Sequence, residues 1–126
     1  MKKIIFVLIT ILLISCTEKK EIVNKDLAYF DSKFVAELGN ENYDEFAGRL
    51  NNKIKPKYID DLIYIHKLIE VNSCGEYSGD IKIKNDSIIL MYNLTSDVVC
   101  TSTRVDKVTY IIKNPKNKKY KFRFKI

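Results

Sequence analysis

The sequence predicts an α+β domain in which two or three N-terminal helices pack on a four-stranded antiparallel meander sheet. Two observations lead to this prediction. Between residues 26 and 71, apolar side chains recur at every third or fourth position, which is the spacing of an amphipathic helix. After residue 76 the spacing changes to two, which is typical of strands that bury one face. We therefore expect one α+β domain over residues 26–126, a common length for a single domain.

Three segments show the helical spacing. The first, residues 26–38, ends at Gly39, and the second, residues 43–50, is separated from the third by Pro56. The third, residues 58–71, has a helical stripe but is also rich in isoleucine and tyrosine, which favour strands. We expect a helix there and keep the strand as the alternative. The stripe residues of the three segments are Leu27, Phe30, Phe34, Val35 and Leu38, then Tyr43, Phe46, Ala47 and Leu50, then Ile59, Leu62, Ile63, His66 and Ile69.

Four strands are expected in the second half of the chain. They cover residues 81–84, 88–92, 105–113 and 119–126. The first two form a hairpin, because the turn-forming residues Asn85, Asp86 and Ser87 separate them. The second strand is apolar on both faces, so we expect it to be central and covered by helices on one side. This order of elements resembles cystatin-like α+β rolls, a likeness of architecture without a shared motif, which implies no function.

The first sixteen residues predict export and a lipid anchor. Two lysines precede an apolar run over residues 4–14, which is too short to cross a bilayer core of about 30 Å. The run leads into the tetrapeptide LISC, which resembles the lipobox of bacterial lipoproteins. The resemblance implies that residues 1–15 are a signal peptide that is removed, and that Cys16 carries the lipid. A conventional secretory signal and a buried N-terminal element are the alternatives.

Residues 16–25 comprise the lipidated cysteine and a tether to the domain. The tether is charged and poor in apolar residues. Its roughly nine residues span at most about 30 Å when extended. We expect the domain to be anchored in the cell envelope outside the cytoplasm, on the outer membrane in a Gram-negative cell. The charge of the chain is unevenly distributed. Residues 17–80 hold nine Lys/Arg against thirteen Asp/Glu, and residues 81–126 hold eleven Lys/Arg against three Asp/Glu.

With Cys16 assigned to the lipid, Cys74 and Cys100 are expected to form a disulfide. Exported chains meet an oxidising compartment, where a remaining pair of thiols usually joins. The hairpin supports this pairing, because Ile81 opposite Leu90 brings both cysteines to the same end of the sheet. Metal binding and nucleophilic catalysis are weaker alternatives, since the chain contains only one histidine.

The sequence assigns no catalytic, metal or cofactor-binding residues. Asp60 and Asp61 with His66 are the one close acid–histidine grouping, but a spacing of five or six places them on different faces of a helix. The glycines form no phosphate-binding motif, and the hydroxyl residues between 95 and 103 lack a neighbouring base. We therefore expect no cofactor, and a binding function rather than an enzymatic one.

The candidate binding residues form a row of cations near the C-terminus. Lys119, Lys121, Arg123 and Lys125 alternate with aromatic side chains, so they are expected to share one face of the last strand. A basic ridge of this kind suits an acidic protein partner or anionic lipid headgroups. Nucleic acid is not expected as a partner, because the anchor places the domain outside the cytoplasm. The alternative interpretation is that the lysines prevent pairing between sheet edges.

Together these observations favour a small envelope lipoprotein that binds a protein or ligand without catalysis, such as an inhibitor or immunity protein. The alternative is a small-ligand-binding or enzymatic roll of the cystatin-like type, with its site between helices and sheet. A pocket lined by inward polar groups favours the roll. A flat surface with one charged patch favours the binding protein.

Overall fold

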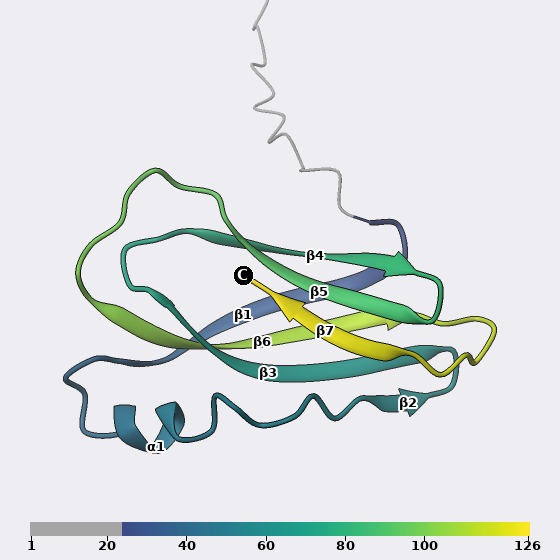
Figure 1. Ribbon diagram of the computed structural model, residues 1–126, viewed down its shortest axis with the longest axis horizontal. Helices are drawn as coiled ribbons and strands as arrows, with labels where there is room; N and C mark the ends of the chain where they lie inside the picture. Colours follow the sequence, from purple (N-terminus) through teal and green to yellow (C-terminus); the bar gives the residue numbers. More distant parts are fainter. Residues whose placement is uncertain (1–23) are drawn as a thin grey trace, which may run out of the picture.

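The computed structural model describes residues 24–126, and the predicted lipidation site Cys16 and the predicted signal peptide lie outside this part of the chain. The described part contains seven strands and one short helix (Figure 1). No helix in it is long and apolar enough to span a membrane. In chain order the elements are β1 (Leu27–Glu37), α1 (Tyr43–Ala47), β2 (Lys57–Ile59), β3 (Leu62–Asn72), β4 (Tyr77–Lys84), β5 (Ser87–Leu94), β6 (Thr103–Lys113) and β7 (Lys121–Lys125).

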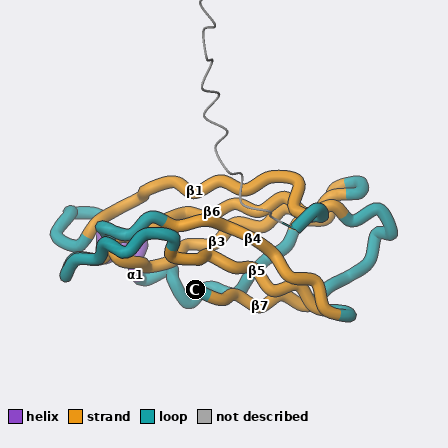
Figure 2. Tube along the Cα trace, turned by 90° about the horizontal axis from the view of Figure 1, so that it is seen from above, coloured by secondary structure: helices purple, strands orange, loops and turns teal. Residues whose placement is uncertain are grey.

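The strands form two sheets, so the predicted α+β class is wrong. The first sheet has the order β1-β6-β3-β2 and the second has the order β4-β5-β7. Their facing sides bury one apolar core, whereas within residues 24–126 no helix packs across either sheet in the manner of a roll. Seen from above, the strands lie along the long axis of a flattened molecule (Figure 2).

The predicted helix over residues 26–38 is strand β1, which pairs with β6. Two β-bulges explain why its sequence has helical spacing. One inserts a residue between Leu27 and Tyr29 and the other between Phe34 and Ala36, so each bulge lengthens the spacing of inward-facing residues from two to three. Leu27 and Phe30 therefore share the inner face although they are three residues apart.

The predicted helix over residues 58–71 is the hairpin β2–β3, and the strand alternative holds. Ile63, Ile65, Ile69 and Val71 are buried at alternate positions against the other sheet, and only Lys67 interrupts this alternation. The two aspartates that suited a first helical turn instead make the β-turn, where Asp60 has a φ of 52°.

The sequence is more informative about the second sheet. The hairpin β4–β5 is confirmed with the expected pairing of Ile81 with Leu90, and the turn lies at Asn85, whose φ is 55°. Strand β5 is central, as expected, but its inner face is covered by a sheet and not by helices. The meander is also wrong: β6 joins the first sheet, and β7 returns to pair with β5 in a parallel direction.

Aromatic side chains fill the middle of the sandwich. The ring of Phe30 lies 5.0 Å from that of Tyr110 and 5.9 Å from that of Tyr92. Phe30 fits only because β4 has a glycine above it, since a Cβ atom on Gly79 would come 2.1 Å from the ring. The interior is therefore closely packed and contains no room for a ligand beneath β4.

The short helix α1 matches the second predicted helix, although it ends at Ala47. It lies on the outer face of the first sheet, where Tyr43 packs with Ala36 and Val105 in a second, smaller apolar cluster. The Tyr43 hydroxyl donates a hydrogen bond to the carboxylate of Glu70. Because α1 covers one end of this face, the other end remains open to solvent.

Candidate functional site

The basic residues predicted near the C-terminus lie at the edge of the second sheet. Lys121, Arg123 and Lys125 project from the outer face of β7, while Phe122 and Phe124 between them pack toward the core. Lys119 precedes the strand, and its ammonium lies 3.6 Å from the centre of the Tyr58 ring on β2. The structure thus brings three of the four predicted cations together and places Lys119 against the other sheet.

Two further lysines extend this row across the sheet. Lys82 and Lys84 are exposed on β4, at the positions that pair with Ile89 and Ser87 of β5. On its other side β5 pairs the same two residues with Arg123 and Lys121. The alternation Ile-Lys-Ile-Lys already indicates that both lysines share an outer face, but only the pairing of β5 with β7 unites the two groups. We call this surface the basic face, and its cations are Lys82, Lys84, Lys121, Arg123 and Lys125.

Few acids compensate these charges. Asp86 in the β4–β5 turn lies 3.6 Å from the Lys121 ammonium, which lowers the pKa of that carboxyl. Asp80 accepts hydrogen bonds from the backbone N–H groups of Asn24 and Ile81, so its carboxylate is committed to the backbone. Within the described residues, no carboxylate lies within 4 Å of the charged nitrogens of Lys82, Lys84, Arg123 or Lys125. The basic face therefore has an excess of positive charge available to a partner.

The centre of the basic face is partly apolar. Ile89 and Met91 of β5 are only partly covered, and the cations of β4 and β7 flank them on both sides. A shallow hollow of about 250 Å³ lies beside Arg123 and includes Ile89 and Lys84 in its wall. An apolar centre with a charged rim is the usual composition of a protein-binding surface.

The predicted proximity of the two remaining cysteines is confirmed. The sulfur atoms of Cys74 and Cys100 are 2.12 Å apart, which joins the β3–β4 turn to the loop before β6. The Asn72 side chain lies between the two segments, because its Oδ1 accepts hydrogen bonds from the backbone N–H groups of both cysteines. This end of the sandwich is thus held by a covalent bond and a shared side chain.

A buried ion pair lies beside the disulfide. The Arg104 Nε atom is 3.0 and 3.1 Å from the two carboxylate oxygens of Asp106, and its Nη1 donates to the Ser73 carbonyl. The Tyr92 hydroxyl donates to the same carboxylate at 2.9 Å and lies 2.7 Å from the Ser32 hydroxyl. Burial and the nearby Asp106 charge raise the pKa of Tyr92 to about 12, although the Ser32 hydrogen bond opposes this change. These groups are fully satisfied and hold the two sheets together.

The acid–histidine grouping does not form a catalytic arrangement. Asp60 and Asp61 lie in the β2–β3 turn, while His66 lies farther along β3 on the outer face. The His66 Nδ1 atom is 3.0 Å from the hydroxyl of Thr109, the residue opposite it on β6. Within residues 24–126, no group of three or more His, Cys, Asp or Glu side chains is placed to hold a metal ion.

Comparisons with protein-family models, with curated proteins and with solved structures returned no match.

Proposed function

We propose that this chain is an exported, lipid-anchored binding domain that holds an acidic protein partner against the basic face. The observation that carries the proposal is the alignment of uncompensated cations from β4 and β7 on either side of an apolar strand centre. Such a surface attracts a partner of opposite charge over a distance and then offers apolar area to bury on contact. An inhibitor or immunity protein is a protein of this type.

The fold favours this proposal over a ligand-binding or enzymatic roll. The roll requires helices packed across a sheet with a concave space between them. In this fold a second sheet takes the place of the helices, and Phe30, Tyr92 and Tyr110 fill the space between the two sheets. The hollow beside the basic face is open to solvent. So is a second one, which lies between β7 and the segment 52–56. A flat charged surface is the feature that distinguishes a binding protein from a pocket enzyme.

The proposal is tested by photo-crosslinking in the intact cell envelope. A photoreactive phenylalanine derivative replaces Ile89, at the centre of the basic face, in the full-length chain. We expect a crosslinked adduct with an acidic protein, and we expect Lys121→Glu with Arg123→Glu to abolish it. The same photoreactive residue in place of Thr109, on the outer face of the other sheet, should not give this adduct.

A matched variant controls for the change in net charge. Lys33→Glu with Lys57→Glu alters the charge by the same amount on the outer face of the first sheet, and it should leave the adduct intact. If position 89 gives no protein adduct and the full-length protein binds phosphatidylglycerol vesicles through Lys121 and Arg123, the partner is a lipid surface. If both double variants behave alike, the basic face has no binding role.

A further inference from the structure

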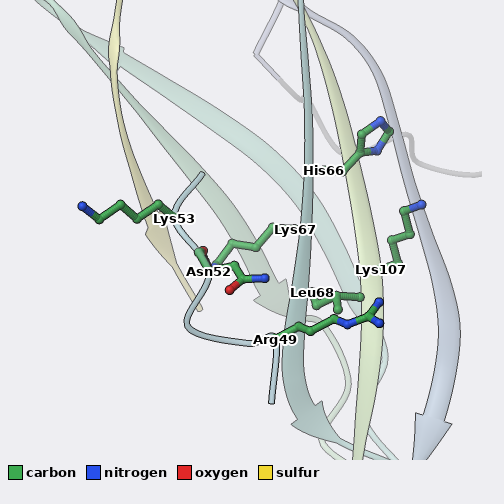
Figure 3. Close-up of a pocket in the computed structure, with 7 residues that line it drawn as sticks. All are labelled: Arg49, Asn52, Lys53, His66, Lys67, Leu68 and Lys107. Carbon is green, nitrogen blue, oxygen red and sulfur yellow. Dashed lines mark hydrogen bonds between the residues drawn. The ribbon is translucent and has the colours of Figure 1, made fainter. Parts of the chain in front are cut away.

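A second cationic site lies on the first sheet, away from the basic face. The segment that follows α1 folds back beside β3 and borders a partly open pocket of about 160 Å³ (Figure 3). This volume is below the roughly 300–1,000 Å³ of pockets that hold drug-sized molecules, which suits a small ion and not a large ligand. Its walls are formed by Arg49, Asn52, Lys53, His66, Lys67, Leu68 and Lys107.

The pocket walls contain four permanent cations and the chain's one histidine, but no carboxylate. Figure 3 shows the guanidinium of Arg49 and the ammonium of Lys107 on the same side of β3 as the His66 ring, whereas Lys53 points away. The Lys67 ammonium is held by the backbone carbonyls of Leu50 and Asn52, which fix its position without neutralising its charge. Walls of one sign concentrate the field in such a cleft.

The strand register makes this concentration of charge unfavourable for the fold alone. Lys33 of β1 lies directly opposite Lys107 of β6, and like charges at opposite positions of an antiparallel pair destabilise a sheet. The Lys33 ammonium pairs with the Asp31 carboxylate at 3.9 Å, and the Arg49 guanidinium pairs with the Glu45 carboxylate at 2.6 Å. Within the described residues Lys107 has no carboxylate within 4 Å. A local arrangement that opposes stability commonly marks a binding site.

The histidine is positioned to respond to an anion. Its Nδ1 is held by the Thr109 hydroxyl, so the ring orientation is fixed. Burial and the charges of Lys107 and Lys57 lower the pKa of His66. Lys53 and Lys55 line an adjoining hollow with it, and Asp31 lies beyond Thr109 in the same cross-strand row. The charges around the ring are thus mostly positive.

We infer that the pocket lined by Arg49, His66 and Lys107 binds a phosphate group. A tetrahedral dianion offers acceptor oxygens in several directions, which suits donors that come from β3, β6 and the segment after α1. The adjoining hollow of about 540 Å³ shares His66, Asn52 and Lys53 with the pocket, and it leaves space for the molecule that carries the phosphate. A neighbouring hollow is lined by Lys53 and Lys67 together with Arg123 of the basic face. The phosphate site uses other donors, so it does not depend on the function proposed for the basic face.

Nuclear magnetic resonance of the single histidine tests this inference. The imidazole signal of the full-length protein in non-ionic micelles is titrated with pH, in inorganic phosphate and in sodium chloride of equal ionic strength. A bound anion favours the charged imidazole, so phosphate should raise the titration midpoint by about one pH unit above the chloride value, with saturation. Sulfate, which keeps its charge throughout, is measured beside phosphate. A parallel series with phosphatidylglycerol vesicles shows whether a lipid headgroup supplies the phosphate.

Two matched variants determine whether the pocket is responsible. In Arg49→Gln with Lys107→Gln, the midpoint of the His66 titration in chloride should rise, because repulsion of the imidazolium is removed. The further rise of this midpoint that phosphate causes in the unchanged protein should disappear. Lys82→Gln with Lys84→Gln removes the same charge from the basic face and should keep the phosphate response. If the His66 midpoint rises with vesicles but not with inorganic phosphate, and the rise is lost in the first variant, the site binds a headgroup phosphate. Equal midpoints in phosphate, vesicles and chloride, or a phosphate response that survives the first variant, overturn the inference.

Discussion

Arg104 on β6 and Arg123 on β7 are both strand residues, but their surroundings differ in every respect. Arg104 is largely buried, pairs with the Asp106 carboxylate, donates to a backbone carbonyl and lies 5.7 Å from the centre of the Tyr77 ring. Arg123 is exposed, and none of the described carboxylates lies within 4 Å of its guanidinium. The stability of the fold therefore depends on Arg104 and does not depend on Arg123. Substitutions at the buried ion pair, at the disulfide beside it and on the basic face should therefore have successively smaller effects on stability.

The largest effect is expected for Asp106→Asn. The substitution leaves the Arg104 charge in a largely buried place without its partner, and removal of one member of a buried pair costs about 3–5 kcal/mol. We expect a loss near the middle of this range, because Asp106 is fully buried and also accepts a hydrogen bond from Tyr92, whereas Arg104 keeps its bond to Ser73. Urea unfolding followed by circular dichroism measures the free energy of unfolding.

A double replacement separates an unpaired charge from lost packing. Arg104→Met with Asp106→Leu removes both charges and keeps most of the volume, so it should recover part of the stability lost in Asp106→Asn. Tyr92 retains its hydrogen bond to Ser32 in this variant. A loss below about 1 kcal/mol in Asp106→Asn contradicts a structural role for the pair.

An intermediate effect is expected for Cys74→Ser with Cys100→Ser. Removing a bridge across a separation of 26 residues frees the unfolded chain, at a cost of about 3.5 kcal/mol in the chain-entropy model. The loss in the free energy of unfolding should match the loss caused by reductant in the unchanged protein. Identical unfolding curves with and without reductant would show that the two thiols are not joined in the protein as isolated.

The smallest effect on stability is expected for Lys121→Glu with Arg123→Glu. Both side chains are exposed, so the free energy of unfolding should change by less than about 0.5 kcal/mol. The alternative is that these charges only prevent β7, an edge strand, from pairing with another molecule. If this edge protection is their role, the double variant should self-associate. Analytical ultracentrifugation distinguishes the two cases: a monomer that has lost its partner supports binding, and aggregates with capture retained support edge protection.

The sequence allowed correct prediction of the β4–β5 hairpin. It failed where bulges or an inward lysine disturb the alternation of a strand, and where distant strands meet. The β4–β5 hairpin was predictable because Asn85 and Asp86 separate two regularly alternating runs. Strand β1 was not, since its two bulges reproduce helical spacing, and β3 was obscured by Lys67 at an inward position. No local pattern reveals that β7 returns to pair in parallel with β5.

The candidate site was predicted in part for the same reason. Alternation along a single strand placed Lys121, Arg123 and Lys125 on one face, and this required no knowledge of partners. The contribution of Lys82 and Lys84 depends on β5 lying between β4 and β7, which no local pattern determines. The cationic pocket is less predictable still, because Arg49 and Lys107 are far apart in sequence and meet only in the folded sandwich.

The pairing of β1 with β6 has a consequence for how the protein reaches its folded state. Strand β1 has no neighbour in its sheet until β6 is present, since Leu27 is held opposite Ile112 near the other end of the chain. Strand β5 likewise lacks one neighbour until β7 follows. A chain that is synthesised with its N-terminus first therefore cannot close the sandwich step by step. Most of its length must be available before the first sheet forms, and contacts of such long range make folding slow.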